Sequence, residues 1–231
     1  FTGAALRQVM FPQTRDPERP LRIGYLSPDF RGHPVGYFME TIRRRHDRSQ
    51  FSISCYAEQA EDDDVTARMR PFIDNWRRTV RLSDADIVRM IQQDRIDILI
   101  DLAGHTSGNR LRVMSSRPAP LQMTYLGYGT TTGVSTIDYR LTDAITDPPQ
   151  EPNLHSEELL RLPAGILCYF PPATAPEPSP LPAARNGFVT FGSFNNLTKI
   201  NSPVLDLWAE ILRSLPDSRL FLKNKSFADQ N

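Results

Sequence analysis

The sequence predicts an α/β protein with a parallel sheet, followed by the beginning of a second α/β domain. Short apolar runs alternate with segments of helical spacing, which is typical of right-handed βαβ units. The first of these runs, residues 21–26, has apolar side chains on both faces of a strand, as expected inside a parallel sheet. A proline-rich segment, residues 171–182, then interrupts the alternation before it resumes.

The first strand leads directly into a candidate site. Pro28 and Gly32 end the apolar run. Pro34 suits the first turn of a helix over residues 35–45, because its missing N–H would have no intrahelical partner there. His33 is therefore expected at the carboxyl end of the strand, where open α/β sheets bind their ligands.

The alternation continues through the first domain. A helix is predicted over residues 65–73, and another begins after Ser83, which is an N-cap residue followed by Asp84 and Asp86 in the first turn. The further strands are predicted at residues 51–57, 96–102, 121–126, 139–141 and 165–169.

Composition divides the chain into four parts. Residues 1–20 are polar and predicted to be a linker, residues 21–170 a complete Rossmann-like domain, residues 171–186 a semi-rigid connector, and residues 187–231 the start of a second Rossmann-like domain.

The second domain is predicted as a single βαβ unit. It comprises strands at 188–194 and 219–223 and a helix over 204–215, with Ser202 as N-cap and Pro203 as first helical residue. One βαβ unit cannot bury its own apolar face, so this domain is expected to be completed by further chain.

The overall composition is that of a soluble globular protein. Lys plus Arg and Asp plus Glu both total 27, so the balance favours neither nucleic acid nor anionic lipid as a partner. Cys55 and Cys168 lie in apolar runs and predict two buried thiols in a reducing compartment, with a single disulfide as the alternative. No leader pattern and no apolar run of membrane-spanning length is present, so a cytoplasmic location is expected.

Four loops that follow predicted strands carry side chains suited to sugar or phosphate oxygens. Because the carboxyl ends of parallel strands meet at one edge of a sheet, each loop is a candidate for a ligand cleft. The residues are His33, then His105 and Thr106 in the loop 104–109, then Tyr128, Thr131 and Thr132 in the loop 127–133, and finally Asn196 and Lys199 in the segment 195–199.

Each candidate has a structural alternative. A histidine after a strand can be a packing or turn residue. Lys199 precedes a helix N-terminus, where an ammonium group is unfavourable unless an anion joins them; this predicts a phosphate partner, with a solvated surface lysine as the alternative. Asp62, Asp63 and Asp64 fit a solvated helix start better than a metal site. Zinc-ligand spacing, a P-loop, a G-x-G-x-x-G fingerprint and a nucleophile elbow are all absent from the sequence.

Five segments carry further information when they are taken together: residues 21–34 (LRIGYLSPDFRGHP), 96–109 (IDILIDLAGHTSGN), 117–122 (RPAPLQ), 126–133 (LGYGTTTG) and 188–200 (FVTFGSFNNLTKI). In their order and spacing they resemble the catalytic region of glycosyltransferase family 41, the O-linked N-acetylglucosamine transferase and SPINDLY family, and they are closer to its SPINDLY-like members.

The resemblance implies a GT-B architecture of two Rossmann-like halves around a cleft, inverting chemistry and no metal. It also implies upstream tetratricopeptide repeats, which residues 1–20 would join to the catalytic region. His33 matches the family histidine of the Asp-Phe-x-x-His-Pro motif, and Lys199 matches the lysine that neutralises the donor diphosphate. Asn196 stands where a polar neighbour contacts the nucleotide, and His105 lies in the Gly-His-Thr sequence of SPINDLY-like members.

Two features depart from the family pattern. Gly129 stands where relatives usually have proline. The chain also ends at Asn231, before the remaining donor-binding loops, so the chain by itself is expected to be inactive.

The expected activity is transfer of a sugar from a nucleotide diphosphate donor to a Ser or Thr hydroxyl of a protein, with no other cofactor. His33 would accept the hydroxyl proton or position the substrates. The donor is expected to be UDP-N-acetylglucosamine or GDP-fucose. A non-catalytic, transferase-like module that binds protein segments is the alternative, and a nicotinamide dehydrogenase is disfavoured by the missing glycine fingerprint.

Overall fold

The chain forms two compact units, Phe1–Pro171 and Pro172–Asn231. Their structure is a computed structural model that describes residues 11, 16, 18–172, 174–224 and 227. Most of the predicted linker, residues 1–20, lies outside the described residues.

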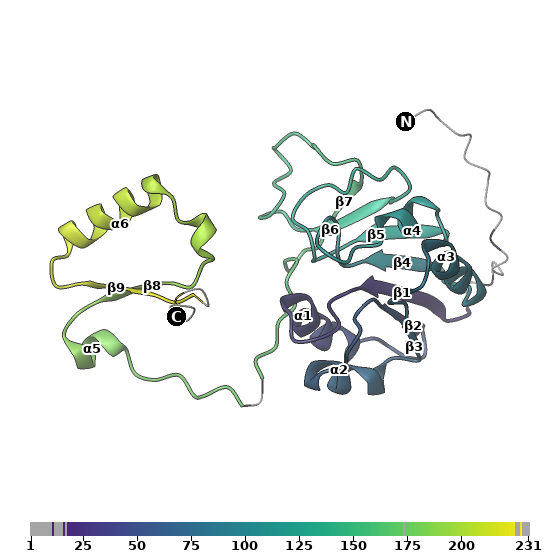
Figure 1. Ribbon diagram of the computed structural model, residues 1–231, viewed down its shortest axis with the longest axis horizontal. Coiled ribbons are helices and arrows are strands. Elements are labelled where there is room, and N and C mark those ends of the chain that lie inside the picture. The colour runs from purple at the N-terminus through teal and green to yellow at the C-terminus, as the bar shows by residue number, and fades with distance from the viewer. Residues whose placement is uncertain (1–10, 12–15, 17, 173, 225–226, 228–231) are drawn as a thin grey trace. The chain divides into compact units, whose positions relative to one another are not determined.

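A seven-stranded parallel sheet in the order β3-β2-β1-β4-β5-β6-β7 forms the centre of the first unit (Figure 1). The strands are β1 (Leu21–Ser27), β2 (Phe51–Ala57), β3 (Asn75–Arg78), β4 (Ile98–Asp101), β5 (Leu121–Thr124), β6 (Tyr139–Thr142) and β7 (Glu158–Arg161). The strand order reverses its direction between β1 and β4, as in Rossmann-like folds. The predicted α/β class and parallel sheet are confirmed.

Helices pack against both faces of this sheet. On one face lie α1 (Pro34–Arg43) and α2 (Asp64–Met69), which is followed by the single turn η1 (Arg70–Phe72). On the other lie α3 (Asp84–Gln93) and α4 (Leu111–Ser115). The sheet is therefore the middle layer of three.

Alternation along the strands produces two separate cores. Val35 and Met39 of α1 pack with Ile23 and Tyr25 of β1 in one buried cluster. In the other, Ile87 and Ile91 of α3 pack with side chains that point to the opposite face of the strands. Ser83 caps α3 as predicted, because its side chain accepts a hydrogen bond from the N–H of Asp86.

The predicted strand at residues 165–169 is wrong. Gly165 has a φ of 96°, outside the range of a strand. The N–H of Ile166 donates to Asp143 Oδ2 (2.7 Å), and its carbonyl accepts from the hydroxyl of Tyr125 (2.6 Å). Side chains therefore satisfy the backbone groups that a ladder would need, and β7 forms the edge of the sheet instead.

The two cysteines differ in environment. Cys55 is buried in β2, and burial raises the pKa of its thiol. Cys168 is exposed, and both thiols are free, so the prediction of two buried thiols is right for Cys55 and wrong for Cys168.

The described residues of the second unit form one parallel strand pair, two α-helices and one 3₁₀ turn. They are α5 (Pro182–Asn186), β8 (Thr190–Ser193), η2 (Leu197–Lys199), α6 (Ser202–Ser214) and β9 (Arg219–Leu222). Asn201, rather than the predicted Ser202, is the N-cap of α6, since its side chain accepts from the N–H of Val204 at 3.2 Å. The predicted connector contains α5.

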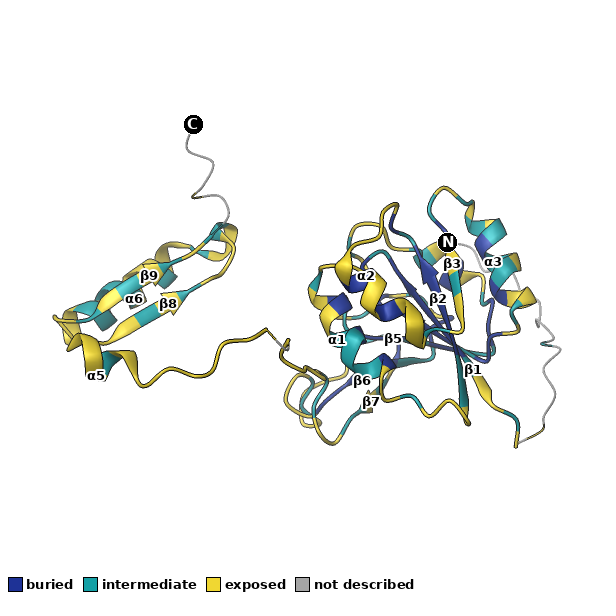
Figure 2. Cartoon of the chain, turned by 90° about the horizontal axis from the view of Figure 1, so that it is seen from below, coloured by how far each residue is buried: buried dark blue, intermediate teal, exposed yellow. Residues whose placement is uncertain are grey.

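The two units also differ in how far their residues are buried. Buried residues fill the sheet and the inner helix faces of the first unit, whereas none of the described residues of the second unit is buried (Figure 2). Among the described residues, no helix has both the length and the apolar character needed to cross a lipid bilayer.

Candidate functional site

A cleft with a volume of about 550 Å³ opens in the first unit at the carboxyl ends of β1, β2 and β4. It lies beside the reversal of strand order, which is where open α/β sheets bind ligands. Two of the predicted residues, His33 and Thr106, line it together with Asp29, Arg31, Glu58 and Glu61.

His33 is the N-cap residue of α1. Its backbone is extended (φ −144°, ψ 152°), and its Nδ1 accepts a hydrogen bond from the N–H of Val35 at 3.3 Å. The same nitrogen lies 3.6 Å from Asp29 Oδ2. The side chain is 41% exposed and lines the cleft, so part of the ring is accessible to a ligand there.

The start of α2 holds the loop that carries His33. Asp63 caps α2 and also accepts a hydrogen bond from the N–H of Gly32 at 2.6 Å. The carbonyl of Phe30 accepts from the hydroxyl of Thr66 (2.7 Å) and from the side-chain amide of Gln59 (2.9 Å). The predicted solvated aspartate is therefore a cap that also contacts the loop bearing His33.

A second predicted group lies next to the cleft. His105 Nε2 is 2.9 Å from the carbonyl oxygen of Thr132, and its ring meets that of Tyr128 edge-on, with centroids 5.2 Å apart. Thr106 donates its hydroxyl to the carbonyl of Ala103 at 2.8 Å. The structure thus joins the loops 104–109 and 127–133, which the sequence placed only at the same sheet edge.

Asp101, at the end of β4, fixes the turn that leads to His105. Its carboxylate accepts from the N–H groups of Ala103 and Gly104 and from the hydroxyl of Thr124. Burial raises the pKa of this carboxyl, since desolvation outweighs the stabilising effect of the three hydrogen bonds.

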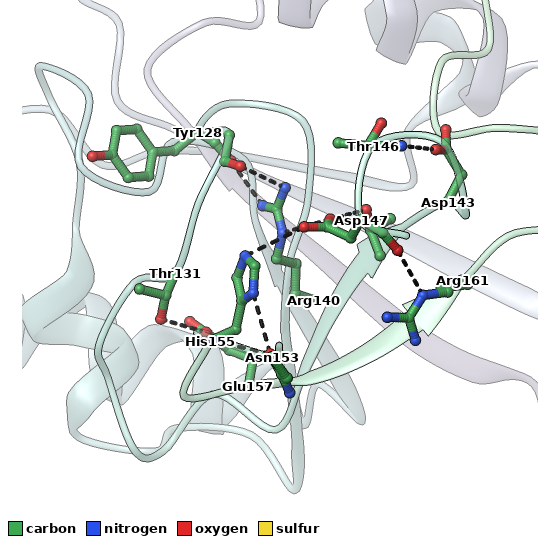
Figure 3. Close-up of polar contacts among 12 residues, drawn as sticks. Tyr128, Thr131, Arg140, Asp143, Thr146, Asp147, Asn153, His155, Glu157 and Arg161 are labelled. Atoms are coloured by element: carbon green, nitrogen blue, oxygen red, sulfur yellow. Dashed lines mark hydrogen bonds and ion pairs between the residues drawn. The ribbon is translucent and has the colours of Figure 1, made fainter. Parts of the chain in front are cut away.

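The hydroxyls of Thr131 and Thr132 are engaged by a residue that sequence reasoning missed. Both donate to the carboxylate of Glu157, which also accepts from the N–H of Thr132 at 2.8 Å. Figure 3 shows the contact between Thr131 and Glu157. Burial raises the pKa of Glu157, but the hydrogen bonds from Thr132 and Thr131 outweigh it and leave the pKa below its ordinary value. Glu157 is therefore a carboxylate held charged beneath the loop.

A second missed residue, Arg140 of β6, supports the same loop. Its Nη1 donates to the carbonyl of Tyr128 (2.9 Å) and its Nη2 to that of Gly129 (3.0 Å). Its Nε lies 3.7 Å from Asp147 Oδ2, and His155 Nε2 approaches the other oxygen of Asp147 at the same distance.

The remaining predicted residues lie in the second unit. Asn196 caps η2 by accepting from the N–H of Thr198 at 3.2 Å, which leaves its amide NH₂ available to a ligand. Lys199 is exposed at the end of the same turn, two residues before the Asn201 cap of α6. The described part of the chain contains no group of three or more His, Cys, Asp or Glu side chains that could hold a metal ion.

Comparison with known families and curated proteins gives consistent matches. The family model described as glycosyl transferase family 41 matches residues 6–169. The SPINDLY protein of Arabidopsis thaliana, a probable UDP-N-acetylglucosamine:peptide N-acetylglucosaminyltransferase, is 44% identical over 98% of this chain and 25% of its own length. The corresponding protein SEC of the same plant is 34% identical over 87% of this chain and 22% of its own length.

A solved structure matches nearly as much of the chain. A mutant of the Thermobaculum terrenum O-GlcNAc transferase is 41% identical, with a TM-score of 0.89 over 96% of this chain and 42% of that one. The chain thus spans about a quarter of the length of these curated relatives.

Proposed function

The chain belongs to glycosyl transferase family 41, and from that premise we propose that it is part of the catalytic region of a protein O-glycosyltransferase of GT-B architecture. The reaction moves a sugar from a nucleotide diphosphate donor to a Ser or Thr hydroxyl of a protein, with inversion and without a metal. The family membership supports this, and one structural observation carries it: His33 lines a cleft at the carboxyl ends of β1, β2 and β4.

In this proposal the two units have different roles. The first unit binds the protein acceptor near His33. The second unit binds the donor, because Lys199 and the N-terminus of α6 lie close together in sequence and both favour an anion. As negative charge develops on the leaving diphosphate, this pair stabilises it.

The donor and the role of Lys199 can be tested in one experiment. The full-length gene product is supplied with UDP-N-acetylglucosamine or GDP-fucose and an acceptor protein, and release of nucleotide diphosphate is measured. We expect release from one donor, and a fall of at least 100-fold in Lys199→Ala, since one preorganised charge is worth about 3 kcal/mol at such a site.

Lys223→Ala is the matched control, because Lys223 is a lysine of the same unit that packs over the ring of Phe194. It should keep wild-type release. Equal losses in both variants would contradict a specific role for Lys199. No release from either donor by a folded gene product would favour the alternative of a non-catalytic binding module.

The contacts of His33 favour a positioning role over that of a base. A neutral ring that accepts from Val35 at Nδ1 carries its proton on Nε2, so it donates to a substrate oxygen. A base at Nε2 would need the proton on Nδ1, held by Asp29, whose carboxylate lies 3.6 Å away.

Asp29→Asn separates these two roles. If His33 donates through Nε2, we expect transfer to fall by less than about tenfold, whereas His33→Ala falls by about 100-fold or more. If His33 is the base, losing the carboxylate that orients it should cost about 10³-fold or more. The measurement is kcat for transfer at saturating donor and acceptor.

A further inference from the structure

Glu157 does not line the cleft, but a short series of contacts connects it to the cleft wall formed by Thr106, Ser107 and Gly108. Its carboxylate fixes the backbone of Thr132, whose carbonyl is 2.9 Å from His105 Nε2. His105 directly precedes Thr106, which lines the cleft. A change at Glu157 therefore reaches the cleft wall through two polar contacts.

Arg140 contacts the same loop from β6. Its guanidinium spans two successive carbonyls, those of Tyr128 and Gly129, and Tyr128 packs against the His105 ring. A planar fork that meets two acceptors fixes the direction of the backbone, which a single donor cannot do.

Both charges are almost completely withdrawn from water, since Arg140 and Glu157 are each 2% exposed. Burying a charge is unfavourable unless it is well paired, and an apolar side chain would fill such a position at lower cost. Most of the partners of these two charges belong to the loop 127–133 rather than to the core. Both charged side chains therefore help to fix the position of the loop 127–133.

We propose that Glu157 and Arg140 are positioning residues that hold the loop 127–133 and the adjoining cleft wall in place for the protein acceptor. The inference rests on the proposed function, which assigns binding of the acceptor to the first unit. Because the loop 127–133 belongs to that unit, we expect it to affect the acceptor and not the donor. Neither residue lines the cleft that contains His33, so their proposed role is indirect.

The test is Glu157→Gln in the full-length gene product, with Glu158→Gln as the matched control on an exposed neighbour. A Gln amide keeps the size of the side chain but places a donor where Thr131 or Thr132 also donates. We expect the KM for the acceptor protein to rise at least tenfold. The KM for the donor and the rate of donor hydrolysis without acceptor should stay within twofold.

Arg140→Lys is the second variant, because a lysine keeps the charge but cannot span both carbonyls. It should raise the acceptor KM in the same way. An unchanged acceptor KM in the folded variants would overturn the proposal. Unfolding of both variants at the assay temperature would assign the pair to stability and would also overturn it.

A measurement on the chain itself separates this inference from the proposed function. In Glu157→Gln, the NMR signals of the His105 ring should shift, because its partner carbonyl on Thr132 moves. They should stay in place in Glu158→Gln. If the wild-type protein transfers no sugar from either donor, the proposed function fails, while an unmoved His105 signal would show that Glu157 does not hold the loop.

Discussion

Gly36→Ala should destabilise the first unit by about 4 kcal/mol or more and displace the loop that carries His33. A Cβ at Gly36 would lie 2.0 Å from the carbonyl oxygen of Arg31 and 3.0 Å from that of Asp29. Both neighbours are backbone atoms, so no side-chain rotation relieves the contact. The loop between β1 and α1 must move, and with it the N-cap contact of His33.

The sign of the change in stability distinguishes an effect of packing from an effect of helix propensity. Gly36 lies within α1, where alanine is intrinsically favoured over glycine by about 1 kcal/mol. Propensity alone would therefore stabilise the variant. Chemical denaturation measures the outcome, with Thr41→Ala in the same helix as a control that should change stability by less than about 1 kcal/mol. A stability equal to or above that of the wild type would show that the loop does not press on Gly36.

Most of the fold follows from local patterns in the sequence. β1 and β2 are apolar and long, and α3 begins with a capping serine and first-turn aspartates, so hydrophobic periodicity and helix-start signals suffice to locate them. Because open α/β sheets bind ligands at the carboxyl ends of their strands, the sequence also predicts His33 and Thr106 as site residues, and both lie in the cleft.

The elements that were missed lack such local signals. β3 reads Asn-Trp-Arg-Arg and is mostly exposed at the sheet edge, while α4 has five residues and no side-chain cap. β7 reads Glu-Leu-Leu-Arg, and its pairing with β6 rather than its own composition makes it a strand. The secondary structure of these three segments therefore depends on tertiary contacts and not on their local sequence.

The same limit applies to the support of the candidate site. In β6 the charged Arg140 is buried, while its apolar neighbours Tyr139 and Leu141 are only partly buried, which reverses the usual expectation for a strand. Glu157 lies 25 residues after Thr132, and no pattern in the sequence connects them. A charged residue at an inward strand position was the one available signal for Arg140.

Gly127→Ala should be at least as damaging as the change at Gly36, because it affects the junction of the two central strand ends. A Cβ at Gly127 would lie 1.9 Å from the carbonyl oxygen of Leu102 and 2.8 Å from the Cα of Ala103. The preceding residue, Leu126, already has a left-handed φ of 62°, so the turn after β5 has little freedom to move away. We expect a loss of about 4 kcal/mol or more in the stability of the first unit.

Gly129→Ala is the matched control for this prediction, two residues further along the same loop. A Cβ there meets no atom within 4 Å, and its carbonyl can still accept from Arg140. Its stability in chemical denaturation should stay within about 1 kcal/mol of the wild type. Equal effects at both glycines would attribute the loss to the general flexibility of the loop. A loss confined to Gly127→Ala would show that stability depends on the close approach of Gly127 to the backbone of Leu102 and Ala103. This approach brings the loop that carries Tyr128 next to the loop that carries His105.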